Sequence, residues 1–205
     1  MVKLEKDTST QEKILLAAKK VFVAKGMAGA RMQDIADEAG INKALLHYYF
    51  RNKEQLFELV FKEAADKLFP KINWIFESDI SLFEKIEQFA DEYITEMLEN
   101  PYLPLFVLNE INRDPQYFLK KVLGEKNRPR PHKFLQQIEK EVKKGVIRNI
   151  DPIQLLMNMI SMTIFPFVGK PMFKANLALD EWQFRNIMEQ RKKEIPKFII
   201  ESIRK

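Results

Sequence analysis

The feature that most constrains the fold is an apolar helical period that runs through almost the whole chain. In the first segment Ile14, Ala18 and Phe22 fall on one helical face, and Gly26 can end that helix. Strand-like alternation and Asn-Gly hairpin signals are missing from the sequence. Gly is scarce, at 6 of 205 residues, which disfavours a turn-rich β architecture. The sequence therefore predicts an all-α protein.

The same period divides the chain into a small N-terminal unit and a larger helical body. We expect the division at residues 1–52 and 53–205, with a fourth helix that begins at residue 53 and joins the two parts. Pro70 should bend this fourth helix or end its regular part, and Pro196 should kink the last helix. Further helices are expected at residues 81–99, 101–112, 115–123, 132–144, 151–165 and 180–204, with a loop at 126–131.

The composition of the chain excludes several kinds of functional site. The chain has no Cys, which excludes disulfides, thiolate metal sites and a cysteine nucleophile. Its two His residues, His47 and His132, lie far apart in sequence, and neither has a metal-ligand partner at helical spacing. A Gly-rich phosphate loop and a nucleophilic Ser elbow are missing too. A helical enzyme stays an open alternative, but nothing in the sequence calls for one, and we expect no metal and no cofactor.

Charge and hydropathy indicate a cytoplasmic protein whose basic excess lies at one end. Residues 1–53 carry ten Lys/Arg and six Asp/Glu, a net charge of +4, whereas the other 152 residues carry 24 and 23, a net of +1. A positive N-terminal quarter favours contact with a polyanion there. Residues 152–169 have no charged side chain, but recurrent polar residues and Pro166 favour a buried or interfacial helix over a membrane span. Residues 1–10 carry no apolar signal segment, so we expect no export and no membrane contact.

Residues 32–50 meet the demands of a helix-turn-helix. Two helices joined by a turn of three or four residues pack at a steep angle, so a small side chain is needed where they come closest. Ala36 supplies it, and Gly40, four positions later, tolerates the positive φ of the turn. Leu46, ten positions after Ala36, can anchor the second helix in the shared core. The alternative is a pair of core helices joined by a Gly turn, but the joint match within a basic unit favours DNA binding.

The second of these helices would then present one face to the major groove of DNA. Five residues are left free for it: Lys43, Ala44, Leu45, His47 and Tyr48. Lys43, at the start of the helix, can reach a phosphate or a guanine edge, with a solvated surface Lys as the alternative. Leu45 can touch a thymine methyl group or be half-buried core. His47 and Tyr48 can donate to phosphates, and a neutral His47 can read a base edge or stay idle in solvent.

These residues resemble the DNA-binding domain of TetR-type (TetR/AcrR) transcriptional regulators. The likeness covers about residues 11–57, and beyond them it rests on length and helix layout. The matching residues are Asp34-Ile35-Ala36, Ala39-Gly40-Ile41, Lys43, Leu46, Tyr49-Phe50, Asn52-Lys53-Glu54 and Leu56, with Ala17-Ala18, Phe22 and Gly26 in the preceding helix.

The resemblance implies an all-α fold in which a three-helix, helix-turn-helix DNA-binding domain is fused to a larger helical domain for effector binding and dimerisation. It implies a homodimer whose two recognition helices sit one DNA turn apart on a palindromic, double-stranded operator. It also implies repression that a small-molecule effector relieves. The turn at residues 145–152 and the two helices after it look like the family's dimerisation pair, which forms a four-helix bundle across the two-fold axis.

The sequence departs from the family pattern on the DNA face rather than in the core. The departures are Asn42 for Ser at the helix cap, Ala44-Leu45 for Gly-Thr, His47-Tyr48 for Tyr-His, and Arg31 for Thr. Asn is an equivalent capping residue, so the first change preserves the helix start. The others leave the fold intact and make the operator sequence unpredictable from relatives.

We expect nine residues to contact DNA. Lys53 opens the fourth helix, where its charge and the backbone N–H groups can face a phosphate. Arg31 and Gln33, at the start of the second helix, are also expected to reach phosphates. The full set is Arg31, Gln33, Asn42, Lys43, Ala44, Leu45, His47, Tyr48 and Lys53.

The expected effector site is an apolar cavity in the body. The chain has 16 Phe, 9 Met and 2 Trp, which can line such a cavity, although at helical spacing these residues more often form plain core. The expected lining, on inward faces of the middle helices, is Phe61, Phe89, Tyr93, Met97, Phe106, Tyr117, Met157 and Phe165. Such a lining favours a hydrophobic or aromatic effector.

A DNA-binding activator or architectural factor that acts through a protein partner, without an effector, is the competing interpretation. A cavity of roughly several hundred Å³ would favour the sensor. A solid core would favour the partner.

Overall fold

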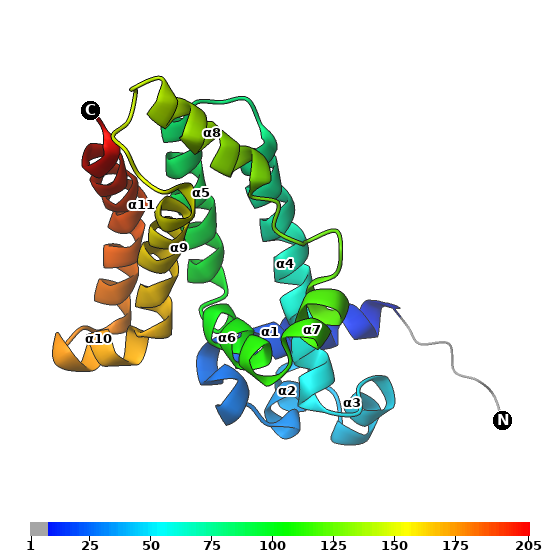
Figure 1. The fold of residues 1–205 in the computed structure, drawn as a ribbon. Coiled ribbons are helices and arrows are strands. Elements are labelled where there is room, and N and C mark those ends of the chain that lie inside the picture. Colours follow the sequence, from blue (N-terminus) through cyan, green and yellow to red (C-terminus); the bar gives the residue numbers. More distant parts are fainter. Residues whose placement is uncertain (1–7) are drawn as a thin grey trace.

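The structure is a computed structural model that describes residues 8–205, and over that range it is helical, with no strand (Figure 1). The helices are α1 (Thr8–Gly29), α2 (Met32–Glu38), α3 (Lys43–Tyr49), α4 (Lys53–Glu77), α5 (Leu82–Glu99), α6 (Leu103–Arg113), α7 (Pro115–Tyr117), the π-helix η1 (Phe118–Leu123), α8 (His132–Lys143), α9 (Pro152–Val168), α10 (Lys170–Asn176) and α11 (Glu181–Ile203). The all-α fold expected from the sequence is confirmed.

The first three helices pack around one small core. Phe22 of α1, Ile35 of α2 and Leu46 of α3 are fully buried in it, as their apolar stripes require. Gly26 interrupts α1 with a φ of 66°, a left-handed conformation that glycine adopts readily and that costs other residues roughly 1–2 kcal/mol. The regular part of α1 therefore stops at the glycine that the sequence marks.

The long helix α4 joins this unit to the body. Asn52 caps its start by accepting a hydrogen bond from the Gln55 N–H at 2.9 Å. The helix passes through Pro70 and continues to Glu77, so the proline does not end it. α4 packs against α1 at one end and against α5 and α8 further along, so it is a continuous helix that connects the two parts of the molecule.

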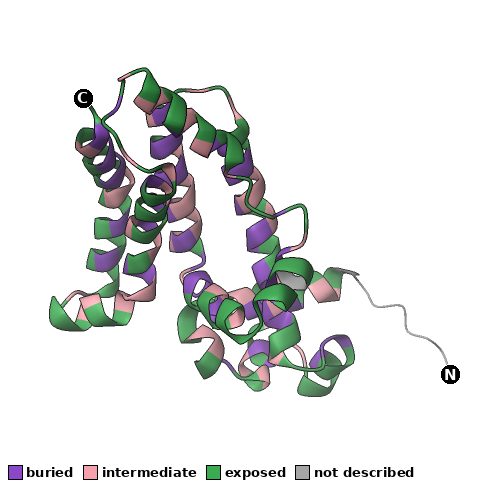
Figure 2. Cartoon of the chain, in the orientation of Figure 1, coloured by how far each residue is buried: buried purple, intermediate pink, exposed green. Residues whose placement is uncertain are grey.

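In the body, α5 is the central helix. Ser81 caps it, and the Glu84 carboxylate accepts a hydrogen bond from the Ser81 N–H at 2.9 Å. α9 and α11 pack along α5, and α8 crosses the ends of α4 and α5 (Figure 1). Figure 2 shows buried residues on the facing sides of α5, α9 and α11 and exposed residues on their outer sides. The core of the body lies between these helices.

A buried lysine binds the C-terminal end of α4. Lys85 of α5 is 1% exposed, and its ammonium donates a hydrogen bond to the Phe76 carbonyl oxygen at 2.9 Å. The carbonyl end of a helix attracts a cation, which offsets part of the cost of burying the charge. Burial lowers the pKa of Lys85, and the nearby Lys133 lowers it further. The contact fixes α5 to the last turn of α4.

The predicted loop at residues 126–131 is anchored on α4. Asn73 of α4 donates a hydrogen bond to the Arg128 carbonyl at 3.0 Å and accepts one from the Arg130 N–H at 2.9 Å. Asn73 is buried, so both of its polar atoms need these partners. The segment before the loop forms α7 and the π-helix η1 instead of one regular helix.

The region after α9 differs from the prediction. α9 continues past Pro166 to Val168. It is followed by a further helix, α10, which the apolar pattern of the sequence did not indicate. Lys174 of α10 pairs with Glu181 of α11 at 2.8 Å, and Lys170 pairs with the same carboxylate. Within the described residues no single helix is long and apolar enough to span a membrane; α9 and α10 pass that test only together, with a bend of 65° between them.

Candidate nucleic-acid interface

α2 and α3 form a tight helix-turn-helix. Two backbone hydrogen bonds close the turn, from the Gly40 N–H to the Asp37 carbonyl at 3.1 Å and from the Ile41 N–H to the Ala36 carbonyl at 3.0 Å. Gly40 has a φ of 65°, as the turn requires. Ala36 is fully buried where the two helices meet, so a larger side chain there would push them apart.

Asn42 fixes the start of α3. Its side-chain oxygen accepts a hydrogen bond from the Leu45 N–H at 2.8 Å, which satisfies one of the unpaired donors of the first helical turn. Such a cap stabilises a helix by about 1 kcal/mol. The side-chain nitrogen of Asn42, which the cap does not use, can donate to a phosphate.

The sequence-predicted residues of α3 lie together on one face. Leu46 and Tyr49 are buried in the core of the small unit, which turns the opposite side of this helix to solvent. The exposed side holds Lys43, Ala44, Leu45, His47 and Tyr48. Leu45 is 37% exposed and Tyr48 is 47% exposed, so neither side chain is buried in the core.

The backbone holds the ring of His47. Its Nδ1 lies 3.2 Å from the Arg51 carbonyl oxygen. Because a carbonyl only accepts, this contact favours the tautomer with the hydrogen on Nδ1, which leaves Nε2 as an acceptor when the ring is neutral. An acceptor at this position suits the amino group of cytosine or adenine. Arg51, which was not among the residues predicted from the sequence, is exposed just after α3; its place directly behind the helix was the available signal.

Arg31 and Gln33 are exposed at the start of α2. The Asp34 carboxylate accepts a hydrogen bond from the Arg31 N–H at 3.0 Å and pairs with Lys25 of α1 at 2.9 Å. The hydrogen bond from Lys25 holds the pKa of Asp34 below its usual value. Gln33 donates to Asp37 along the helix at 2.7 Å. These contacts fix the start of α2 and leave the Arg31 side chain exposed to solvent.

Lys53 lies differently from the sequence expectation. Its ammonium donates hydrogen bonds to the carbonyl oxygens of Met27 and Ala30, at 2.9 and 3.2 Å, and lies 3.5 Å from that of Ala28. These carbonyls follow the break in α1, where the helix leaves them without partners. In the absence of DNA, the ammonium therefore fastens the end of α1 to the start of α4, and the expected phosphate contact stays a prediction. The backbone N–H groups at the α4 start are unaffected by this contact.

Three of the expected effector residues share one cavity between α4, α5 and α6. Phe61, Tyr93 and Met97 line it. The other lining residues were not predicted from the sequence: Ala64, Ala65, Leu68, Phe69, Leu103, Pro104 and Val107. The cavity measures about 20 Å³, room for about one water molecule. Burial raises the pKa of Tyr93. The apolar walls meet closely, so an effector could enter only after they separate.

Phe89 and Phe106 face inward as expected, but they pack as core. The ring centroid of Phe106 lies 4.3 Å from that of Phe57 and 5.2 Å from that of Phe61. Phe89 stacks on Phe76 with a centroid distance of 5.7 Å. Each such pair contributes about 0.5–1.5 kcal/mol beyond the area it buries.

Tyr117, Met157 and Phe165 do not face inward, which corrects the expected lining. They are 41%, 54% and 54% exposed. α9 instead turns the following residues inward: Leu155, Met159, Thr163, Pro166 and Phe167. Because α9 is apolar on nearly every side, its sequence alone did not distinguish the inner face from the outer one.

Within residues 8–205, no group of three or more His, Asp or Glu side chains is placed to hold a metal ion. His47 lies on α3 and His132 opens α8, in different parts of the molecule. His132 lies 2.9 Å from Gln136 of its own helix.

Comparison with known proteins agrees with this geometry. Residues 14–60 match the profile of the family described as "Bacterial regulatory proteins, tetR family". The matched stretch contains the core of α1, all of α2 and α3, and the start of α4.

Curated relatives resemble the same end of the chain. The HTH-type transcriptional repressor KstR2 of Mycolicibacterium smegmatis is 33% identical over 78 residues, which are 38% of this chain and 38% of the relative. The HTH-type transcriptional activator FasR of that organism is 40% identical over 55 residues, 27% of this chain and 25% of the relative. The chain thus matches well under two thirds of the length of these relatives.

Solved structures resemble the chain over nearly its whole length. The ketosteroid transcriptional regulator KstR2 of Mycobacterium tuberculosis has a TM-score of 0.67 at 16% identity, over 98% of this chain and 97% of that one. At this identity the likeness shows the fold alone.

Proposed function

Residues 14–60 match the family described as "Bacterial regulatory proteins, tetR family", and from that premise we propose that this chain is a TetR-type regulator and not an enzyme, namely a cytoplasmic, ligand-responsive repressor. It would bind a palindromic operator as a homodimer and leave it when a small hydrophobic or aromatic effector binds. In this proposal residues 1–52 contact DNA, and residues 53–205 bind the effector and form the dimer.

The observation that carries the proposal is the exposed face of α3. Leu46 and Tyr49 anchor the helix in the core, so the opposite side is presented rigidly to solvent. A rigid helix with one cation at its start and polar and apolar side chains along one face suits insertion into a major groove.

The proposed contacts divide into positioning and reading. Lys43 and Arg31 would bind phosphates, with Gln33, Asn42 and the α4 backbone N–H groups beside them. Ala44, Leu45, His47 and Tyr48 would face the bases, where Leu45 can touch a thymine methyl and His47 can accept a hydrogen bond.

Exposed apolar side chains support a dimer through α9 and α11. Ile153, Met157 and Ile160 lie on the outer face of α9, and Phe198 is exposed on α11. α9 and α11 pack against each other, so in this proposal one partner surface would cover side chains of both helices. Large apolar groups clustered on two neighbouring helices are typical of a surface that a second subunit covers.

Effector binding would require the small cavity to open. Effector pockets usually hold roughly 300–1,000 Å³, far more than the 20 Å³ present between α4, α5 and α6. Two of its walls reach α1 through aromatic contacts: Phe57 of α4 lies 4.7 Å from Phe22, and Tyr102, just before α6, lies 6.3 Å from it. In this proposal the displacement of α6 would carry the signal.

Tyr102, next to the start of α6, is the proposed relay. Its ring centroid lies 5.3 Å from that of Phe57 in α4 and 6.3 Å from that of Phe22 in α1. Movement of α6 would therefore tilt α1 and α4 and change the spacing of the two α3 helices. Because tight binding needs both half-sites at once, a coupling of about 1–3 kcal/mol is enough to release the operator.

The closed cavity favours a second candidate. A DNA-binding activator or architectural factor that acts through a protein partner needs no effector pocket, and a body core with only about 20 Å³ of free space between α4, α5 and α6 agrees with it.

Selection of bound duplexes from a random pool tests the function directly. We expect the purified chain to recover a palindrome with half-sites about one helical turn apart. Recovery of nothing above background at moderate salt would contradict the repressor and the activator alike. The recovered palindrome then serves as the probe in an effector screen. Apolar aromatic compounds that release it support the sensor, and unchanged operator affinity with all of them supports the partner-dependent candidate.

A further inference from the structure

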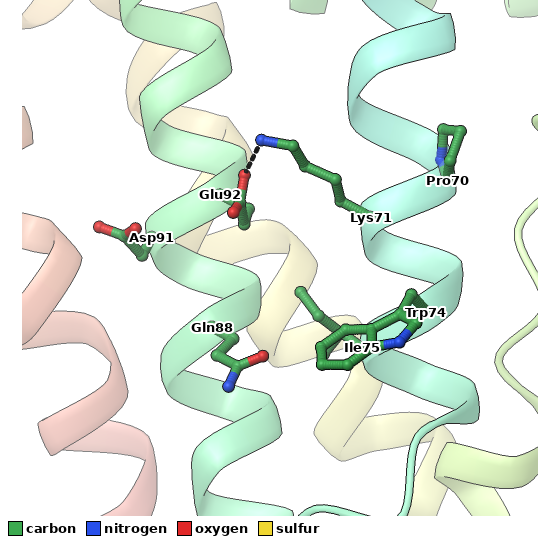
Figure 3. A pocket seen from close by; sticks show the side chains of 7 residues that line it. All are labelled: Pro70, Lys71, Trp74, Ile75, Gln88, Asp91 and Glu92. Carbon is green, nitrogen blue, oxygen red and sulfur yellow. Dashed lines mark hydrogen bonds and ion pairs between the residues drawn. The ribbon is translucent and has the colours of Figure 1, made fainter.

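An open groove runs between α4 and α5, apart from the closed cavity. It has a volume of about 450 Å³, within the range of small-molecule sites. Its walls are Pro70, Lys71, Trp74 and Ile75 of α4 and Gln88, Asp91 and Glu92 of α5 (Figure 3). It shares no lining residue with the cavity around Phe61, and none of its residues belongs to α9 or α11.

Trp74 gives the groove a flat aromatic wall. Its side chain lies on the side of α4 that faces α5 (Figure 3), and it is 59% exposed although Trp is usually well covered. Ile75 is buried and adds an apolar floor. A planar ring that stacked on Trp74 would remove apolar area from water on both partners.

An ion pair spans the groove beside this wall. The Lys71 ammonium donates a hydrogen bond to the Glu92 carboxylate at 2.7 Å (Figure 3). That bond, with smaller effects of Glu96 and Glu99, raises the pKa of Lys71. One ammonium group therefore lies in the field of three carboxylates on α5.

The other charges nearby do not reverse this balance. Lys67 pairs with Glu63 on α4 at 3.4 Å. Burial raises the pKa of Glu96, although the positive charges of Lys67 and Lys19 lower it in part. Asp91 also lines the groove, and the Lys192 ammonium of α11 lies 4.0 Å from its carboxylate. Among the lining residues, the carboxylates of Asp91 and Glu92 outnumber the single ammonium of Lys71, so a bound cation would be favoured over an anion.

We propose that the groove binds a flat aromatic cation of about three fused rings, stacked on Trp74 with its charge beside Glu92. The ring system would gain a cation–π contact, worth roughly 0.5–2 kcal/mol depending on its exposure to water. Glu92 can share its second oxygen or exchange Lys71 for the ligand, because an exposed ion pair contributes only about 0–1 kcal/mol. The site does not depend on DNA binding, so it stands or falls separately from the proposed repressor function.

The test uses the full-length chain, without DNA, and three probes of one shape. N-methylacridinium is a cation, acridine is neutral at about pH 8, and acridine-9-carboxylate is an anion. In a Trp182→Phe background Trp74 is the single tryptophan, so quenching of its fluorescence reports the groove. We expect saturable, one-to-one binding of the cation, at least tenfold tighter than the neutral probe, with calorimetry as a second measurement. Equal affinity for all three probes, or no saturation, would overturn the proposal.

Two charge variants should move the affinity in opposite directions. Glu92→Gln removes the carboxylate and leaves Lys71 without its partner, so the cation should bind at least tenfold more weakly and the anion should gain. Lys71→Met removes the competing ammonium, so the cation should bind several-fold more tightly. Glu87→Gln, on the same helix but outside the groove, is the matched control and should change nothing. Equal effects of Glu92→Gln and Glu87→Gln would also overturn the site.

Discussion

At the residue scale, Lys43 is the cation best placed to meet DNA. It is exposed in the first turn of α3, on the face opposite the buried Leu46. We expect Lys43→Ala to weaken operator binding by about 1–3 kcal/mol, roughly 5- to 150-fold, with the fold intact. Titration of labelled operator measures the loss. Lys140→Ala, an exposed cation on α8, is the control and should bind as the unmodified chain does; equal losses in both would mean that only total charge matters.

Lys53 is expected to act through the fold and not through its charge. Because its ammonium bonds to carbonyls at the end of α1, Lys53→Met should lower the free energy of unfolding by about 1.5–3 kcal/mol. Operator affinity should fall as α1 and α4 loosen, while the slope of affinity against salt stays the same, since no phosphate contact is lost. Chemical denaturation and titrations at several salt concentrations measure the two quantities. A slope smaller by about one ion would instead place the ammonium on a phosphate.

At the scale of the element, the start of α3 depends on one side chain. Asn42→Ala should destabilise the DNA-binding unit by about 1 kcal/mol, because the Leu45 N–H loses its acceptor. Asn42→Ser should restore stability, since Ser caps equally well. Thermal unfolding of the three chains measures this. If operator affinity does not return with stability in the Ser variant, the amide of Asn42 contacts DNA as well as capping the helix.

The helix ends show why elements could be predicted from sequence. Asn42, Asn52, Ser81 and Asp180 each cap a helix by binding an N–H three residues ahead. These contacts are local, so the residues that make them stand together in the sequence. The helix α10 escaped prediction because it has no buried face and is held by ion pairs to Glu181, which lies on another helix.

At the scale of the whole molecule, the outer faces of α9 and α11 should hold two subunits together. Met157→Glu would place a charge in the centre of the proposed interface, where it has no partner. We expect the chain to become monomeric and to lose tight operator binding while keeping its helical content. Light scattering coupled to size-exclusion chromatography measures the mass. Leu16→Glu, at a similarly exposed position on α1, is the control and should leave the dimer intact; a dimer in both variants would place the interface elsewhere.

The sequence by itself determined the helix-turn-helix. Ala36, Gly40 and Leu46 lie within ten positions of one another, and their sizes and backbone freedom are properties of the residues themselves. The spacing of Leu46 and Tyr49 likewise indicated which side of α3 faces the core, although Leu45 on the other side is apolar too.

Only the tertiary structure decided how distant parts meet. Lys53 bonds to carbonyls more than 20 positions away, and Lys71 pairs with Glu92 across two helices, so no local pattern signals either contact. Met157 and Phe165 turn outward because packing on α5 selects one side of a helix that is apolar all round. The reason is common to these cases: local periodicity defines a face, but the fit between elements decides what that face touches.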